Sequence, residues 1–329
     1  MKEELLQVNN LKIYYPVSSK QIGKKEYVKA VDDVSFRVKR GEVFGIVGES
    51  GCGKSTLGRG ICKLEEPDFG KVLLEGEDIS KYNSRQMQPV RKKVQMIFQD
   101  PYASLNPRMS VYDIIAEPLI IHRLTRNQDE LKERVYGLLK KVGLDEYHAR
   151  RYPHEFSGGQ RQRIGIARAL AVEPRLIIAD EPVSALDVSI QAQVLNLLNQ
   201  LKKEFSLTYL FIAHDLSVVE HISDRVGVMY LGNFVEEGPK EMLYCNPLHP
   251  YTQALLSAVP VPDPLKKRER IILEGNIPSA LNPPAGCKFH SRCPRCMEHC
   301  SSQVPKQYEV EPGHFVSCHL YEGNNKFIK

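Results

Sequence analysis

The sequence has no run approaching the ~20 consecutive apolar residues that a membrane-spanning helix requires. It begins with the charged Met1-Lys2-Glu3-Glu4, and no apolar segment follows, so we expect no secretory signal. Neither sign of charge is in large excess, because 45 basic and 40 acidic residues give a net charge of +5. This excess is too small and too dispersed to indicate a nucleic-acid partner. We find no internal repeat. These absences predict a cytosolic globular protein.

The cysteines are unevenly placed. Eight cysteines in a reducing compartment do not indicate a disulfide framework. Five of them crowd towards the end of the chain, which indicates a metal site: Cys287, Cys293, Cys296, Cys300 and Cys318. The densest basic run, Lys266-Lys267-Arg268-Glu269-Arg270, is predicted to be a solvated linker. A chain of 329 residues has room for one large domain and an appendage.

One stretch carries a specific motif. Gly48-Glu49-Ser50-Gly51-Cys52-Gly53-Lys54-Ser55 satisfies G-x-x-x-x-G-K-[ST] between the apolar run 42–47, read as a strand, and a helical pattern that begins at Thr56. The glycines let successive N–H groups point at a phosphate, and the helix dipole adds positive potential. Lys54 can then reach the β- and γ-phosphates and Ser55 can ligate Mg²⁺. The alternative is a chance Gly-rich turn.

Polar residues lie at or just beyond the carboxyl ends of three further strands, predicted at 94–98, 175–181 and 208–213. They are Gln99, the pair Asp180 and Glu181, and His214. The carboxyl ends of strands in an open α/β sheet face the ligand crevice. An acid associated with Mg²⁺ and a general base would require the two carboxylates there, whereas the alternative is simple capping. For His214 the alternative is a structural histidine.

The rest of the sequence predicts further strands and helices. Strands are expected at 6–15, 28–38 and 71–74, and a hairpin at 226–235. Residues 106–151 show helical spacing without strands, and His122 and His148 are predicted to be surface residues there. Helices are expected at 161–172, with Ser157 as the N-cap, and at 188–205. After Gly238, prolines predict a surface extension with one helix near 251–258.

Two residues allow two readings each. Tyr15, just ahead of the phosphate-binding loop, could stack on an adenine or be a half-buried strand residue. Cys52, near Lys54 and a helix start, could have a lowered pKa and react with alkylating agents, or be buried and point away.

In order and spacing, these motifs resemble the ATP-binding subunits of ABC transporters over residues 5–240. The resemblance implies an α/β fold with a P-loop NTPase core, an antiparallel β subdomain and a helical insertion at about 106–155. It implies a nucleotide-binding domain of 1–240 and a C-terminal extension of 241–329 that holds metal at its cysteines.

The resemblance also implies residue roles. Gln99 matches the Q-loop, Asp180 the end of Walker B, Glu181 the catalytic glutamate and His214 the switch histidine. Mg²⁺ would be held by Ser55, Gln99 and Asp180. The nucleotide contacts would come from the Walker A loop, an aromatic residue, the signature motif with its unusual leading Phe156, and the D-loop: Tyr15, Gly48, Ser50, Gly51, Cys52, Gly53, Lys54, Ser55, Thr56, Ser157, Gly158, Gly159, Gln160 and Asp187.

The resemblance narrows to the oligopeptide/dipeptide import branch at 100–109 with 115–119, at 249–256 and at 287–294. In that branch the cysteines matching Cys287, Cys293, Cys300 and Cys318 hold a [4Fe–4S] cluster. Cys296 departs from the pattern, and its spacing to Cys293 leaves zinc as the alternative ion. The segment Tyr14-Tyr15-Pro16-Val17 resembles the second of the two paired ATPases of this branch more than the first.

The resemblance implies partners. In the family, the serine that matches Ser157 faces the nucleotide bound to the neighbouring ATPase. Two ATPases, either paralogues or copies, would therefore form a head-to-tail dimer. Import would further need two transmembrane permease subunits and an extracytoplasmic peptide-binding protein, with this chain peripheral at the cytoplasmic face of the membrane. The alternative function is a soluble ABC-type ATPase whose zinc module acts on nucleic acid.

Overall fold

The computed structural model describes residues 3–18, 25–259 and 270–323. The chain divides into two compact units. Unit 1 comprises Met1–Leu5, Lys39–Glu42 and Lys81–Ile212, and unit 2 comprises Leu6–Val38, Val43–Ser80 and Ala213–Lys329. No helix among the described residues is both long enough and apolar enough to span a bilayer.

Unit 1 is built on three parallel strands, β6 (Val94–Ile97), β7 (Leu176–Asp180) and β8 (Thr208–Ile212). β7 lies between the other two, with Ile178 opposite both Met96 and Leu210. Every residue of β7 and β8 is buried, as expected of parallel strands covered on both faces. This explains why both strands are nearly continuous apolar runs in the sequence.

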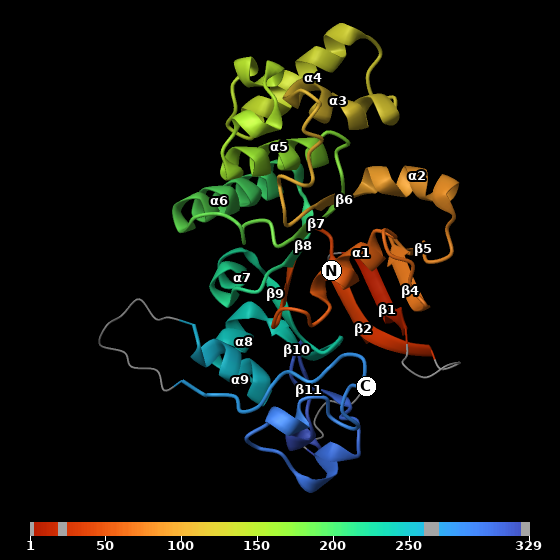
Figure 1. The fold of residues 1–329 in the computed structure, drawn as a ribbon, viewed down its shortest axis with the longest axis vertical. Helices are drawn as coiled ribbons and strands as arrows, with labels where there is room; N and C mark the ends of the chain where they lie inside the picture. Colours follow the sequence, from red (N-terminus) through yellow and green to blue (C-terminus); the bar gives the residue numbers. More distant parts are fainter. Residues whose placement is uncertain (1–2, 19–24, 260–269, 324–329) are drawn as a thin grey trace. The chain divides into compact units, whose positions relative to one another are not determined.

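The helices of unit 1 are α2 (Ser84–Lys93), α3 (Val111–Ile121), α4 (Gln128–Lys141), α5 (Gly158–Leu170) and α6 (Val188–Phe205). Short 3₁₀ turns, η1 (Glu146–Arg150) and η2 (Pro153–Glu155), follow α4. α3, α4 and α5 pack together (Figure 1). Residues 106–151 therefore contain helices and no strand, as the spacing predicts. The sequence did not indicate α2.

The surface position expected for His148 is wrong. Its side chain is buried, its Nδ1 accepts from the Asp145 N–H at 2.9 Å, and its ring lies 5.4 Å from that of Phe156. An isolated histidine in a polar segment gives no periodic signal of burial. The hydrogen bond within η1 decides its position.

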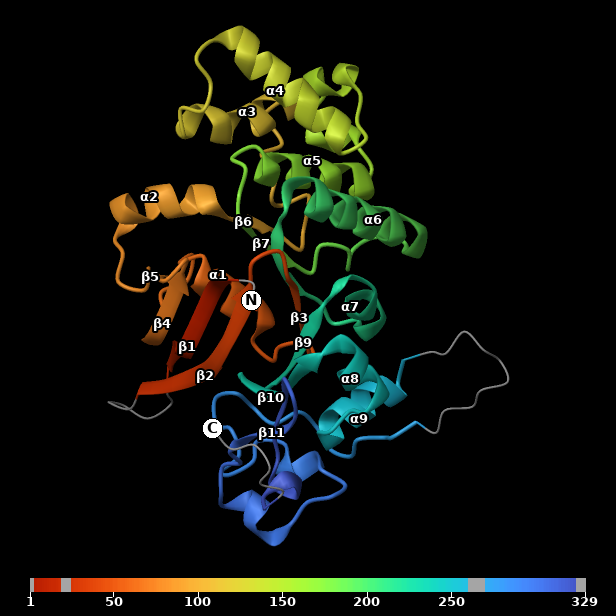
Figure 2. The same ribbon diagram turned by 180° about the vertical axis from the view of Figure 1, so that it is seen from behind.

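In unit 2 a four-stranded sheet has the order β2 (Lys25–Lys39), β1 (Glu4–Ser18), β4 (Phe69–Leu74) and β5 (Glu77–Asp78). β4 runs antiparallel to both of its neighbours. Helix α1 (Lys54–Ile61) packs against β1: a Cβ on Gly60 would lie 2.3 Å from the Cδ1 of Ile13. Both views show α1 beside this sheet (Figures 1 and 2).

A second set of strands in unit 2 begins with β3 (Val43–Val47), which is parallel to β9 (Arg225–Tyr230). β10 (Asn233–Pro239), β12 (His314–Ser317) and β11 (Gln307–Glu311) follow, each antiparallel to the one before. The predicted hairpin is confirmed, and Leu231 and Gly232 form its turn with φ of 41° and 82°.

The sequence did not indicate β11 and β12 at the cysteine-rich end of the chain, where β12 pairs with the hairpin strand β10. The carboxylate of Glu236 on β10 is buried and accepts from the N–H groups of Leu248 and His249, at 2.9 and 2.8 Å. The His314 ring lies 2.8 Å from the same carboxylate. The basic residues 266–269 lie outside the described residues.

Helices α7 (Leu216–Ile222), α8 (Lys240–Cys245) and α9 (Pro250–Ser257) and three 3₁₀ turns complete the described part of unit 2. Of these turns, η3 (His290–Arg292) and η4 (Glu298–Ser301) lie among the cysteines, and η5 (His319–Tyr321) directly follows Cys318. We call residues 287–318 the cysteine segment.

Candidate functional site

The predicted strand–loop–helix order around the motif is confirmed. β3 is buried throughout and ends at Val47, and α1 begins at Lys54. Gly48 and Gly53 have φ of 155° and 105°, and a Cβ would lie 2.1 Å from the Met229 carbonyl oxygen or 2.0 Å from that of Ala30. Only glycine fits these two positions, because other residues would meet both backbone strain and steric overlap.

The loop ends on a helix start that is open to a ligand. Gly53 is the N-cap of α1 and supplies no side-chain oxygen to the first N–H groups of the helix. The buried ammonium of Lys54 donates to the carbonyl oxygens of Gly48 and Glu49, at 2.8 and 3.0 Å, so it lies against the loop. N–H groups, a helix dipole and an ammonium together form a site suited to phosphate.

The hypothesis that Cys52 is an activated thiol is wrong. Its side chain is buried, and burial raises the pKa of the thiol, although Lys54 opposes the shift. The other reading, a buried side chain, describes it better. Desolvation therefore outweighs the nearby positive charge.

An unpredicted ion pair connects this loop to the cysteine segment. Arg292 Nη1 donates to Glu49 Oε2 at 2.8 Å, and Nη2 donates to Oε1 at 3.1 Å. The Glu49 N–H also donates to the Tyr251 hydroxyl at 2.9 Å. The hydrogen bonds to Glu49 raise the pKa of Arg292. Because 243 residues separate the two partners, no local pattern could have indicated the pair.

Unit 2 also contains Tyr15 and His214. Tyr15, near the end of β1, is half-buried, whereas the neighbouring Tyr14 hydroxyl donates to Asp32 Oδ1 at 2.5 Å. His214 is exposed and lies just beyond the carboxyl end of β8.

In unit 1 the structure brings Gln99 and Glu181 together. Asp180 is the buried last residue of β7, and Glu181 follows it with φ of 45°, which is rare for a side-chain-bearing residue. Gln99, two residues after β6 ends, donates from Nε2 to Glu181 Oε2 at 3.0 Å. The hydrogen bond orients a carboxylate next to the buried Asp180, as the strand-end argument predicts.

The start of α5 is also in unit 1. Ser157 is its N-cap, as predicted, and exchanges hydrogen bonds with Gln160 in a capping box. A Cβ on Gly159 would lie 2.4 Å from the Cγ2 of Ile190 in α6, so glycine permits the close approach of these helices. Asp187 is the N-cap of α6, without a side-chain cap bond.

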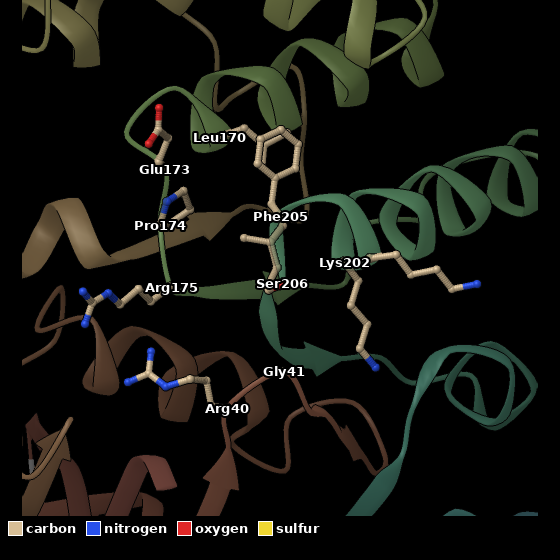
Figure 3. A pocket seen from close by; sticks show the side chains of 11 residues that line it. Arg40, Gly41, Leu170, Glu173, Pro174, Arg175, Lys202, Phe205 and Ser206 are labelled. Atoms are coloured by element: carbon tan, nitrogen blue, oxygen red, sulfur yellow. The ribbon is translucent and has the colours of Figure 1, made fainter. Parts of the chain in front are cut away.

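Unit 1 also has a cavity of about 670 Å³ whose lining includes none of the predicted site residues. It includes Arg175 and Leu207, which precede β7 and β8, so it is at the amino ends of these strands rather than the carboxyl ends. Arg40 and Arg175 extend to one side and Lys202 to the other (Figure 3). Lys202 is in the last turn of α6, where a cation complements the helix dipole. We assign no nucleotide contact to this cavity.

The thiols of the cysteine segment converge. Cys300 and Cys318 are buried, Cys287 and Cys293 are half-buried, and Cys296 is exposed. Burial, reinforced by the neighbouring cysteines, raises the pKa of Cys287 to about 11 and that of Cys318 to about 12. The groups that act on Cys318 include Cys287, Cys293 and Cys300. Four thiols thus share one environment, and the exposed Cys296 also acts on Cys287 and Cys293.

Comparisons with known proteins agree with this geometry. The family model described as ABC transporter matches residues 31–184, and the model described as Oligopeptide/dipeptide transporter, C-terminal region, matches 235–300. The chain is 58% identical to the oligopeptide transport ATP-binding protein AppF of Bacillus subtilis over 97% of this chain and 98% of that protein. It is 50% identical to the dipeptide transport ATP-binding protein DppF of Escherichia coli, over 97% and 95%.

Among solved structures, a dimeric post-hydrolysis state of the ATP-binding cassette MJ0796, bound to ADP and Pi, superposes with a TM-score of 0.64. Its sequence is 29% identical, and the match covers 72% of this chain and 99% of that chain. CbiO1 from Clostridium perfringens, described as part of the transporter complex cbiONQ, also gives 0.64, at 28% identity over 74% and 92%.

Proposed function

The chain belongs to the ATP-binding subunits of oligopeptide and dipeptide ABC transporters, and on this premise we propose which of its residues hydrolyse the ATP that powers peptide import. The observation that carries the proposal is the hydrogen bond from Gln99 to Glu181 beside the buried end of β7. The matched family models support a nucleotide-binding domain of 1–240 and an extension of 241–329.

ATP binds at the loop between β3 and α1. Tyr15 stacks on the adenine, and Lys54 neutralises phosphate charge. The loop N–H groups and hydroxyls hold the phosphates, from Gly48, Ser50, Gly51, Cys52, Gly53, Ser55 and Thr56. The open N-terminus of α1 supports this assignment.

Mg²⁺ would be held by the Ser55 hydroxyl, the Gln99 amide oxygen and, through water, Asp180. Hydroxyl, amide and carboxylate oxygens are the ligands that this ion prefers, so the donor set fits. When bound, the ion neutralises charge that develops on the phosphates.

Glu181 is the general base: its carboxylate accepts a proton from the attacking water, while Gln99 fixes its orientation. His214 contacts the γ-phosphate. Glu181→Gln should abolish hydrolysis, retain ATP binding and accumulate an ATP-bound dimer, measured by turnover, nucleotide binding and light scattering. Glu204→Gln in unit 1, which removes a partly exposed carboxylate on α6, is the control. Turnover near that of the control would contradict the assignment.

A single chain holds half of each hydrolytic site. Ser157, Gly158, Gly159, Gln160 and Asp187 complete the site of a second ABC ATPase, which is a paralogue or another copy, in a head-to-tail dimer. The dimeric state of MJ0796 supports this assembly. Closure of the dimer on ATP drives two permease subunits, an extracytoplasmic protein delivers the peptide, and the ATPase is peripheral at the cytoplasmic face. The relatives do not support the alternative nucleic-acid function.

Cys287, Cys293, Cys300 and Cys318 hold a [4Fe–4S] cluster, with a structural role in the cysteine segment. The mutual electrostatic influence of these thiols supports a metal site that they share. Anaerobically purified chain should contain about four irons and four sulfides with broad visible absorption, and Cys318→Ser should lose them. Colourless protein with one zinc per chain would contradict the assignment.

A further inference from the structure

A second group of ligand atoms lies beside the cysteines. His299 is in η4, His319 begins η5, and Glu322 follows η5. One ring nitrogen of each histidine and one carboxylate oxygen of Glu322 all lie within 4.8 Å of one another. The two rings meet edge to face, with centroids 4.7 Å apart. The three side chains therefore converge on a single point.

The hydrogen bonds of His319 fix where its proton lies. Nε2 is 3.0 Å from the carbonyl oxygen of Gln303, which can only accept, so Nε2 carries a proton. In the neutral ring, Nδ1 then presents a lone pair, and it faces Glu322 Oε2 at 3.2 Å. Two acceptors at this distance require either a second proton on the ring or a cation that both can bind.

His299 favours the cation. Its Nε2 is buried and has no hydrogen-bond partner among the residues that the structure describes. Burying a ring nitrogen without a hydrogen-bond partner costs free energy of folding, so the unpaired atom indicates a missing partner such as a bound ion. A proton between His319 and Glu322 would leave His299 unexplained, whereas a metal ion would serve all three residues.

We propose that His299, His319 and Glu322 bind a divalent transition-metal ion, with Zn²⁺ the best match, at a site separate from the four cysteine thiols. Two imidazoles and one carboxylate are a common zinc ligand set that leaves the fourth position for water. The bond from His319 Nε2 to the Gln303 carbonyl is the outer contact that metal-bound histidines usually make.

The site would act as a clamp on the cysteine segment. His299 and His319 directly adjoin Cys300 and Cys318, which are the two buried cysteines of the segment. An ion bound to both histidines would fix η4 and η5 relative to each other. Glu322 would tie the end of the described chain to the same point.

Co²⁺ is the probe, because its spectrum reports ligand type. The full reduced chain, purified anaerobically, is titrated with Co²⁺, and we expect one ion per chain whose visible bands lack sulfur-to-metal charge transfer. Any ion on the cysteines would show that charge transfer and is counted separately. Zn²⁺ should displace the sulfur-free signal.

Glu322→Gln should weaken binding at the sulfur-free site by roughly tenfold or more, since it removes a ligand. The Glu322 side chain is 55% exposed, so its substitution should not disturb packing. Glu298→Gln, an exposed carboxylate next to His299, is the matched control and should bind Co²⁺ like the wild type. His299→Asn should weaken binding similarly.

Equal Co²⁺ affinity in the wild type, Glu322→Gln and His299→Asn would overturn the proposal, as would Co²⁺ spectra with sulfur ligation alone. An ordinary His319–Glu322 ion pair would then account for the contact. Circular dichroism of each variant before metal addition verifies the fold.

Discussion

The phosphate-binding loop and the cysteine segment both belong to unit 2, yet their conformations arise in different ways. The loop takes its shape from glycines within eight consecutive residues, among them Gly48 and Gly53 with positive φ. The cysteine segment depends on distant partners: the Cys287 N–H donates to the Cys300 carbonyl, and β12 pairs with β10. Local sequence thus specifies the first region, and long-range packing specifies the second.

The two regions are joined at Arg292 and Glu49. Arg292 has 7% of its side chain exposed and Glu49 23%, so the ion pair is largely shielded from water. Lys288, also in the cysteine segment, donates to Asp32 Oδ2 and to the Leu231 carbonyl, both at 2.9 Å. The phosphate-binding loop, whose conformation its own glycines specify, is therefore held in place by the cysteine segment, whose conformation depends on distant partners.

The sharpest contrast between the regions should be in hydrolysis. Lys54→Met removes the ammonium from the phosphate site, so ATPase activity should fall by roughly 10²-fold or more. Lys288→Met removes a lysine from the cysteine segment and should retain most activity. Steady-state phosphate release measures both. Equal losses would mean that Lys54 has no special role at the phosphates.

In stability, Gly53 of the loop and Gly286, which immediately precedes the cysteine segment, should behave alike. A Cβ on Gly53 would lie 2.0 Å from the Ala30 carbonyl oxygen, and one on Gly286 would lie 2.4 Å from that of Cys300. Each alanine variant should lower the free energy of unfolding by about 3 kcal/mol, from strain and overlap. Gly76 has φ of 82° but open space, so Gly76→Ala should cost only about 1 kcal/mol. Urea unfolding that ranks Gly76→Ala highest would contradict this.

Acid should weaken the packing against the cysteine segment. His249 lies against Phe289, and burial lowers the pKa of the histidine from 6.5 to about 3. Between those values the unfolded chain binds a proton that the folded chain does not, so the free energy of unfolding falls as the pH falls. The slope contributed by this residue approaches about 1.4 kcal/mol per pH unit.

His249→Asn retains a side chain that can cap α9 but does not titrate. Subtracting its pH dependence from that of the wild type isolates the histidine. Parallel curves for the two proteins between pH 6.5 and 4 would show that His249 does not carry the effect.

The smallest effect should be the loss of ATP affinity when the ion pair between Arg292 and Glu49 is broken. Arg292→Ala leaves the Glu49 carboxylate uncompensated beside the phosphates, so ATP affinity should fall by about tenfold. Glu49→Gln in the same chain should restore most of it, because the repulsive charge is removed. Arg295→Ala, an exposed neighbour, is the control. Calorimetry with ATP measures each, and identical affinities would remove the functional link.

The sequence predicted the features that local residues specify and missed those that depend on long-range packing. β3 lies within the predicted run 42–47 and α6 has the predicted bounds, since a buried apolar run and an 18-residue amphipathic pattern are local signals. The capping role of Ser157 was equally readable. α2, the pairing of β12 with β10 and the burial of His148 were missed, because each depends on partners that the local pattern does not show. For Cys52, the balance between Lys54 and burial required the packed structure.

The division of each hydrolytic site between two chains is tested most directly by complementation. Glu181→Gln and Ser157→Arg should each be inactive alone, because every site in either homodimer lacks one part. In a mixture, each heterodimer would rebuild one intact site, so activity should recover to about a quarter of wild type if chains of twofold symmetry exchange freely. No recovery, in a mixture shown by mass spectrometry to contain heterodimers, would contradict the account.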